Sequence, residues 1–226
     1  MPGITVDSTL ASKQEMIVLI AGLGLSIPMT VFGIVGLPGS GKSEAAAVAR
    51  ELDVPVVTMG DVIRGACRDR GLDPATHHGE VAKALRAENG PAAIAEASLP
   101  HIEDGLEDSE HVVVDGIRSD VEVERFQAAF GEEFLLVSVE APFETRADRL
   151  DLRGRDASVE DGGESLQDRD ERELGFGMGE AMEMADVTIE NVDSLADFQE
   201  RIETLLTDGP SALADDERIE LAEGNA

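Results

Sequence analysis

Apolar residues along the chain gather in short runs that are separated by longer segments of mixed polarity. The runs lack the polar alternation of half-exposed strands and are typical of strands buried on both faces of a parallel sheet. They occupy residues 30–36, 54–59, 111–115, 134–140 and 186–191. Helices are predicted between and after them, at residues 42–52, 61–70, 78–89, 91–104, 119–130, 142–152 and 194–206. The pattern predicts a three-layer α/β domain with a five-stranded parallel sheet.

Both ends of the chain lie outside this alternation. Residues 16–41 carry no charge and are long enough for a membrane helix, but several glycines and Pro28 interrupt them. We expect residues 1–28 to be an extension outside the fold, with Met29 as the natural start, and residues 29–207 to form the domain. Residues 208–226 are rich in acidic side chains and are expected to be a disordered tail.

The charge balance narrows the classes of partner that the protein can bind. The chain has 48 acidic and 18 basic residues and a net charge of −30, so its field repels nucleic acid and anionic membranes. Arginine is strongly preferred over lysine, which together with the acidic excess indicates a soluble protein of an extreme halophile, because high salt screens self-repulsion. The single cysteine, Cys67, excludes an intramolecular disulfide framework and fits a reducing cytoplasm.

One segment has the spacing of a phosphate-binding loop, with a predicted strand before it and a predicted helix after it. Its residues are Gly36, Leu37, Pro38, Gly39, Ser40, Gly41, Lys42 and Ser43. The glycines allow backbone N–H groups to approach phosphate oxygens, Lys42 reaches the β and γ phosphates, and Ser43 ligates Mg²⁺. Asp115, at the end of another predicted strand, is a second candidate magnesium ligand, or alternatively caps a turn. ATP and Mg²⁺ are therefore the expected cofactors.

The arginines are concentrated in one part of the chain. Six of them fall within 27 residues: Arg146, Arg149, Arg153, Arg155, Arg169 and Arg172. The first three have the i, i+3, i+7 spacing of one helical face. We expect this cluster to belong to a lid at residues 153–175 that closes on phosphate charge. The alternative is a solvated face of ion pairs, because aspartates lie among these arginines.

Three segments carry a family resemblance that extends over residues 30–207. "TMGDVIR" (58–64), "VVVDGIR" (112–118) and "VEAPFETRADRLDLRGR" (139–155) resemble the nucleoside monophosphate kinase group of P-loop proteins. The resemblance implies that Arg64 and Arg118 bind the phosphate of an acceptor, within and beside a helical acceptor-binding region at residues 60–104. It also implies that Arg149 and Arg153 reach the phosphates from the helix that leads into the lid.

Other segments resemble two related families. "ELDVPVVTMGDVIR" (51–64) and "ADVTIENVDSLADFQERIETLL" (185–206) are similar to dephospho-CoA kinase, with Asp61 in the place of an acidic residue near the acceptor hydroxyl. "RDERELGFGMGEAMEMADVTIEN" (169–191) resembles an uncharacterised archaeal family of adenylate-kinase-like P-loop proteins. In that family an Arg-Asp-x-Arg-Glu pattern marks the lid, which implies lid roles for Arg169 and Arg172. Arg155 is expected in the lid because it falls within the arginine cluster.

These features predict a kinase that transfers the γ-phosphate of ATP to a nucleotide-like acceptor, in the first place a nucleoside monophosphate. The predicted catalytic residues are Lys42, Asp61, Asp115, Arg149 and Arg153. A hydroxyl acceptor, as in dephospho-CoA kinase, would need Asp61 as the proton acceptor, unless Asp61 only caps its helix. A nucleotide-dependent ATPase or regulator is the other alternative. The expected partners are small-molecule nucleotides, without nucleic acid or membrane, and the protein is expected to be a monomer or homodimer.

Overall fold

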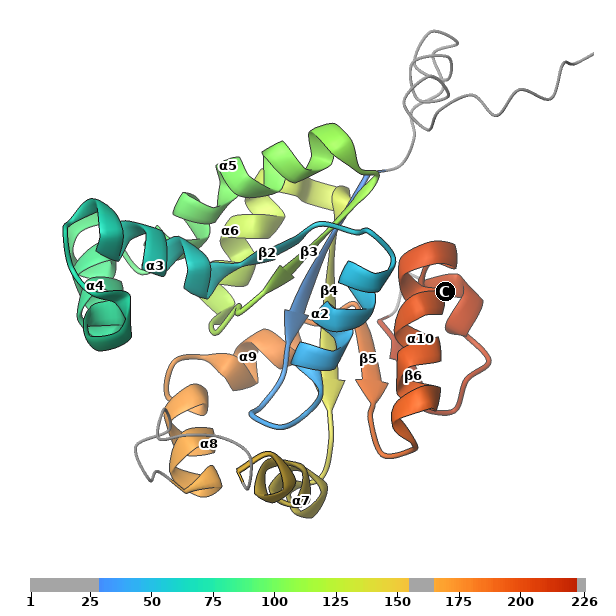
Figure 1. The fold of residues 1–226 in the computed structure, drawn as a ribbon. Coiled ribbons are helices and arrows are strands. Elements are labelled where there is room, and N and C mark those ends of the chain that lie inside the picture. Colours follow the sequence, from blue (N-terminus) through green and yellow to red (C-terminus); the bar gives the residue numbers. More distant parts are fainter. Residues whose placement is uncertain (1–28, 155–164, 223–226) are drawn as a thin grey trace, which may run out of the picture.

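A single sheet forms the centre of the molecule (Figure 1). The computed structural model describes residues 29–154 and 165–222, with the backbone alone for residues 151–154; the extension predicted at residues 1–28 lies outside this part. The strands are β1 (Thr30–Val35), β2 (Val56–Thr58), β3 (His111–Asp115), β4 (Phe134–Glu140), β5 (Val187–Glu190) and β6 (Ile219–Leu221). Their order in the sheet is β2-β3-β1-β4-β5-β6.

Helices cover both faces of this sheet and give the molecule three layers (Figure 1). The helices are α2 (Lys42–Glu51), α3 (Met59–Asp69), α4 (Pro74–Asn89), α5 (Ala93–Asp108), α6 (Asp120–Phe130), α7 (Phe143–Gly154), α8 (Leu166–Leu174), α9 (Met178–Glu183) and α10 (Leu195–Asp208), with short 3-10 helices η1 (Gly131–Glu133) and η2 (Pro210–Leu213). The predicted α/β class and the five parallel strands β1 to β5 are confirmed.

Alternate residues of β1 enter two separate hydrophobic cores. Val31 and Val35 pack with residues of α3, α5, α6 and α9 on one face of the sheet. Phe32 and Ile34 pack with residues of α2 and α10 on the other face. All four side chains are almost fully buried. Because both faces of the strand are buried, polar residues cannot alternate with apolar ones, which is the pattern the sequence shows.

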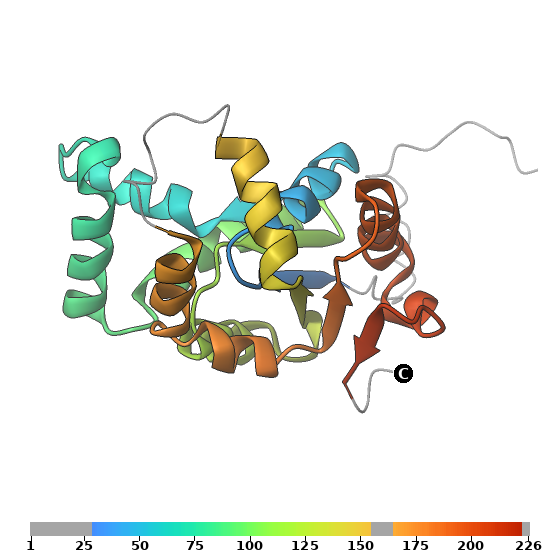
Figure 2. The ribbon, with the colours of Figure 1, turned by 90° about the horizontal axis from the view of Figure 1, so that it is seen from below.

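The carboxyl ends of the parallel strands face the part of the molecule where the predicted site residues lie. In Figure 2, α7 crosses the loop that follows β1, and α8 and α9 lie beside it. The helices α3 and α4 extend away from the sheet beyond β2, and with α5 they occupy the predicted acceptor-binding region (Figures 1 and 2). In the described part of the chain no helix is both long and apolar enough to cross a membrane.

The C-terminal segment differs from the disordered tail that its acidic composition suggests. Within residues 208–222 the chain forms η2 and then β6, which pairs with β5 in antiparallel fashion and adds a sixth strand. Leu213 is buried in the core beneath α10, and Ile219 and Leu221 pack against the same core. These few apolar residues are spaced too widely among charged residues to produce a strand pattern in the sequence. The segment forms a strand because the edge of β5 can pair with it.

Candidate active site

The loop between β1 and α2 has a backbone conformation that requires glycine at two positions. Gly36 and Gly41 have φ values of +143° and +127°, which residues with a side chain rarely adopt. A Cβ atom at Gly36 would collide with the carbonyl of Val139, and one at Gly41 would collide with the side chain of Asn191. The helix α2 begins at Lys42, so its free N–H groups and the positive end of its dipole point toward the loop.

Lys42 is partly buried and turned back over the loop. Its Nζ atom donates hydrogen bonds to the carbonyl oxygens of Gly36, at 2.6 Å, and Leu37, at 3.1 Å. Burial lowers its pKa from 10.5 to about 8, although the carboxylates of Asp115 and Glu173 partly raise it again. The amine therefore lies among carbonyl and carboxylate oxygens, which favour a cation. A phosphate at this place would supply more negative charge than these groups do.

Asp115 lies at the carboxyl edge of the sheet, between the ends of two neighbouring strands. In the strand register it is the partner of Ile34 on β1 and of Thr58 on β2. Burial raises the pKa of its carboxyl group, and the nearby charge of Lys42 opposes this rise. The structure thus places Asp115 close to the phosphate loop, as the sequence predicted.

Arg146 pairs with a carboxylate in the structure. The sequence had left open whether its partner is a phosphate or a carboxylate. Its guanidinium forms two hydrogen bonds of 2.7 Å with the carboxylate of Asp170 on α8, and both side chains are largely buried. It also donates to the carbonyls of Pro38, in the phosphate loop, and Ala141. Arg146 therefore pairs with a carboxylate, but it is buried and not on the solvated face that the alternative described, and it joins α7, α8 and the loop.

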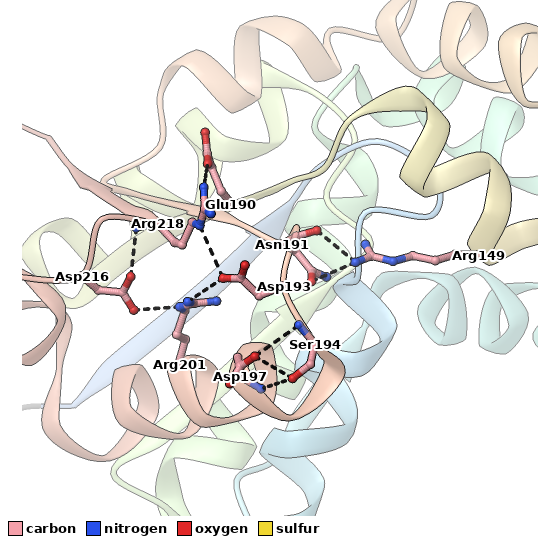
Figure 3. Close-up of polar contacts among 9 residues, drawn as sticks. All are labelled: Arg149, Glu190, Asn191, Asp193, Ser194, Asp197, Arg201, Asp216 and Arg218. Atoms are coloured by element: carbon pink, nitrogen blue, oxygen red, sulfur yellow. Dashed lines mark hydrogen bonds and ion pairs between the residues drawn. The ribbon is translucent and has the colours of Figure 1, made fainter.

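Arg149, one turn further along α7, points at the same loop from another direction (Figure 3). It donates to the carbonyl of Ser40 at 3.2 Å and to the carbonyl and the side-chain oxygen of Asn191 at 3.0 and 3.1 Å. The structure thus places Arg149 beside the phosphate loop on backbone carbonyls, and its contact with phosphate stays a prediction.

The structure describes only some of the remaining lid arginines. Arg169 and Arg172 lie on α8, where Arg172 pairs with Glu173 at 3.4 Å. Arg155 and the side chain of Arg153 lie outside the described residues. The predicted convergence of the whole cluster on phosphate is therefore untested, whereas a connection of α8 to the loop through Arg146 is present.

The two predicted acceptor arginines both pair with carboxylates. Arg64 forms an ion pair of 2.7 Å with Asp61, three residues earlier on α3. Asp61 does not cap this helix, because α3 begins at Met59 with Thr58 at the N-cap, so the capping alternative is wrong. Arg118 forms an ion pair of 3.0 Å with Glu173 of α8. Both arginine side chains remain about half exposed, which leaves them accessible to a ligand.

Two residues of the site were missed by sequence reasoning. Glu173 is buried, contacts Arg118 and lies close enough to Lys42 to raise its pKa; its signal was the last position of the Arg-Asp-x-Arg-Glu pattern. Asn191 is buried and donates to the carbonyl of Ser40 at 2.8 Å. Its signal was its place directly after β5, since ligands of open α/β sheets bind at the carboxyl ends of strands.

The fold and the loop agree with the relationships found by comparison. Residues 33–173 match the family model of an AAA domain. This match assigns the chain to the class of P-loop proteins. The chain belongs to the UPF0200 family within this class. It is 58% identical over 178 residues to a UPF0200 protein of Halobacterium salinarum, which covers 79% of this chain and 93% of the relative. A UPF0200 protein of Methanosarcina acetivorans is 45% identical over 181 residues, covering 79% and 94%.

Solved structures share the fold at low sequence identity. The crystal structure of TT1252 from Thermus thermophilus has a TM-score of 0.55 and 20% identity, and covers 80% of this chain and 97% of its own. A shikimate kinase from Bacteroides thetaiotaomicron has a TM-score of 0.50 and 17% identity, covering 79% and 98%. These similarities confirm a P-loop kinase-like fold, and the archaeal relatives agree with the archaeal family that the sequence resembles. Membership of the nucleoside monophosphate kinase group stays a prediction.

Proposed function

We propose that this protein is an ATP-dependent phosphotransferase that acts on a small molecule. The observation that carries the proposal is the phosphate loop itself, in which a partly buried lysine lies over backbone carbonyls and a partly buried aspartate stands at the end of the neighbouring strand. In this role the loop binds the phosphates, and Lys42 neutralises the charge of the transferring group. The single cysteine is consistent with a cytoplasmic enzyme.

Magnesium fits this site as an ion shared with the nucleotide. The described residues contain no group of three His, Cys, Asp or Glu side chains suited to hold a metal. Ser43 and Asp115 are the side chains that would hold Mg²⁺, and phosphate oxygens would complete its coordination. The bound ion would supply charge neutralisation between the phosphates.

The acceptor that the sequence favours is a nucleoside monophosphate. Support comes from Arg64 on α3 and Arg118 in the loop after β3, which are both partly exposed. Arg118 also lies close enough to Lys42 to affect its pKa. A phosphate bound there would replace Asp61 and Glu173 as the partner of each guanidinium. Such an acceptor is already ionised, so its reaction needs no base.

A hydroxyl acceptor is the second candidate, and the same ion pairs favour it. Asp61 and Glu173 are carboxylates close to the positions where an acceptor would bind. Either could take the proton of an alcohol as its oxygen attacks the γ-phosphorus and the bond to ADP breaks. Because both arginines are already neutralised, this acceptor would not have to displace a carboxylate.

Phosphoryl transfer from γ-labelled ATP with Mg²⁺ in molar KCl tests the proposal. The acceptor panel contains the common nucleoside monophosphates, dephospho-CoA and shikimate. Label on a monophosphate supports the first candidate, and label on an alcohol supports the second. Label released only as inorganic phosphate would contradict a phosphotransferase and favour the ATPase or regulator.

Replacement of Arg64 by alanine is expected to weaken acceptor binding selectively. If Arg64 binds an acceptor phosphate, the loss of a charged hydrogen bond should raise the acceptor KM about 10- to 100-fold and leave the ATP KM unchanged. Arg70→Ala is the matched control, since Arg70, which directly follows α3, is also held in an ion pair, with Glu88. Equal changes in the two KM values would contradict the assigned role.

The affinity for MgATP is expected to fall above pH 8. Lys42 loses its proton near this pH when no nucleotide is bound, whereas nucleotide phosphates favour the charged amine, so binding takes up a proton. The dissociation constant should then rise by up to about tenfold per pH unit above pH 8. Calorimetric titration between pH 7 and 9.5 measures this slope. A Lys42→Met variant that retained the slope would show that another group is responsible.

A further inference from the structure

Every polar group of Asn191 takes part in a hydrogen bond, and its side-chain amide contacts the phosphate loop. Its side-chain Nδ2 donates to the carbonyl of Ser40 at 2.8 Å, and its own backbone N–H donates to Glu140 at 2.7 Å. Its two oxygens accept from Arg149 (Figure 3). The residue is 4% exposed, so the amide is held in one orientation between β4, α7 and the loop.

This contact, together with the longer one from Arg149 to the same carbonyl, fixes the direction of one peptide group in the loop. The C=O and N–H groups of a trans peptide point in opposite directions. A hydrogen bond that draws the Ser40 carbonyl toward Asn191 therefore directs the N–H of Gly41 away from Asn191. N–H groups of such loops bind the phosphates, so the orientation of this peptide determines whether one donor is available for phosphate.

The C-terminal segment fixes the residues on both sides of Asn191 (Figure 3). On one side, the N–H of Glu190 donates to the carbonyl of Arg218 at 2.8 Å, and the guanidinium of Arg218 pairs with the Glu190 carboxylate at 3.3 Å. On the other side, Asp193 pairs with Arg218 at 3.4 Å and with Arg201 of α10 at 2.9 Å.

Asp216 completes this connection. It pairs with Arg201 at 2.7 Å and accepts from the backbone N–H of Arg218 at 2.9 Å. Arg201 is largely buried between its two aspartates. Arg218 of the C-terminal segment thus contacts the turn between β5 and α10 directly, and Asp216 is connected to it through Arg201. The same turn carries Asn191.

The segment itself is anchored independently of these charges. Leu213 is buried, and β6 pairs with β5 from Val187 to Ile189. The backbone N–H of Ala222 also donates to Asp186. Removal of one ion pair should therefore leave the strand in place and alter mainly the turn, since partly exposed ion pairs contribute little to global stability.

We propose that Asn191 is a positioning residue of the phosphate loop, and that residues 209–222 form a brace that holds the turn carrying it. This inference rests on the proposed function, in that ATP is the ligand of the loop. It gives the C-terminal strand a part in nucleotide binding, because the brace and the loop meet at the same short turn.

The experiment compares two probes, MgATP and the magnesium complex of inorganic tripolyphosphate, by calorimetric titration of the full chain in molar KCl. Asn191→Asp keeps the size of the side chain and an acceptor for Arg149 but loses the donor to Ser40; Asn191→Ala loses both. For each variant, the dissociation constants of both probes are expected to rise about 10- to 100-fold and in parallel. Asn191→Ala separates the lost donor from the added charge of Asn191→Asp.

Several outcomes would overturn the positioning role. A loss for MgATP with unchanged binding of tripolyphosphate would show that Asn191 contacts the nucleoside instead of orienting the loop. Unchanged binding of both probes by the Asn191 variants, when Lys42→Ala abolishes binding, would refute the inference and leave the proposed function intact. Failure of the wild-type protein to bind MgATP would refute both.

The brace is tested by Arg218→Ala, with Arg125→Ala as the matched control. Arg125 pairs with Glu96 between α6 and α5, on the face of the sheet opposite α10. Arg218→Ala is expected to weaken binding of both probes about three- to tenfold, with Arg218→Lys intermediate, while the two alanine variants have similar melting temperatures. Equal affinities of the two alanine variants would refute the brace.

Discussion

Replacement of Lys42 by alanine is expected to lower phosphoryl transfer by at least about a thousandfold and to leave the fold intact. The variant loses the one charge that lies directly over the loop carbonyls of Gly36 and Leu37. In a site of this kind, one preorganised group that stabilises transition-state charge contributes about 10²–10³ in kcat, and Lys42 also contributes to binding. Transfer from γ-labelled ATP measures the loss.

The fold should tolerate this change because the charged amine is not favoured in its buried position. Burial depresses its pKa to about 8, so the melting temperature of Lys42→Ala is not expected to fall below that of the wild type. Lys83→Ala, at an exposed position on α4, is the control and should keep full turnover. Retained turnover in Lys42→Ala would exclude the loop as the catalytic site.

Asp170→Asn is expected to have the largest effect on stability. The change removes the charge partner of Arg146, and both side chains are almost buried in a two-bond geometry. Loss of one member of a buried ion pair costs about 3–5 kcal/mol, because the other charge remains without compensation. For a chain of this length, the melting temperature should fall by roughly 10 °C.

The same variant should also lose activity, because Arg146 contacts the carbonyl of Pro38 and thereby connects α8 to the phosphate loop. Glu171→Gln is the matched control, since Glu171 is the next residue of α8 and is exposed. Thermal unfolding followed by circular dichroism compares the two. Similar melting temperatures for both variants would show that the Arg146–Asp170 pair contributes little to the fold.

The strands and the phosphate loop could be predicted because their causes are local. A strand such as β3 (His111–Asp115) must be apolar along its length to be buried on both faces. The loop needs glycine where φ is positive, as at Gly36 and Gly41, and it needs a lysine directly after them. These requirements apply to neighbouring residues, so they appear as a pattern in the sequence.

The partners of the arginines could not be predicted in this way. Arg146 lies 24 residues from Asp170, and Arg118 lies 55 residues from Glu173. An arginine binds carboxylate and phosphate through the same donors, so composition alone does not distinguish a structural ion pair from a ligand contact. The choice depends on which carboxylates the packing of α8 brings to the loop.

The C-terminal strand also depends on tertiary contacts that the sequence pattern does not show. The acidic composition of residues 208–226 indicated a tail, but an edge of β5 was open and a few apolar residues sufficed to pair and pack there. The sequence by itself determined the class of fold, the phosphate loop and its lysine, since each follows from residues adjacent in the chain. Only the tertiary structure decided that Asn191 and Glu173 lie beside that loop and that the C-terminal segment contacts the turn carrying Asn191, because these contacts join residues far apart in the sequence.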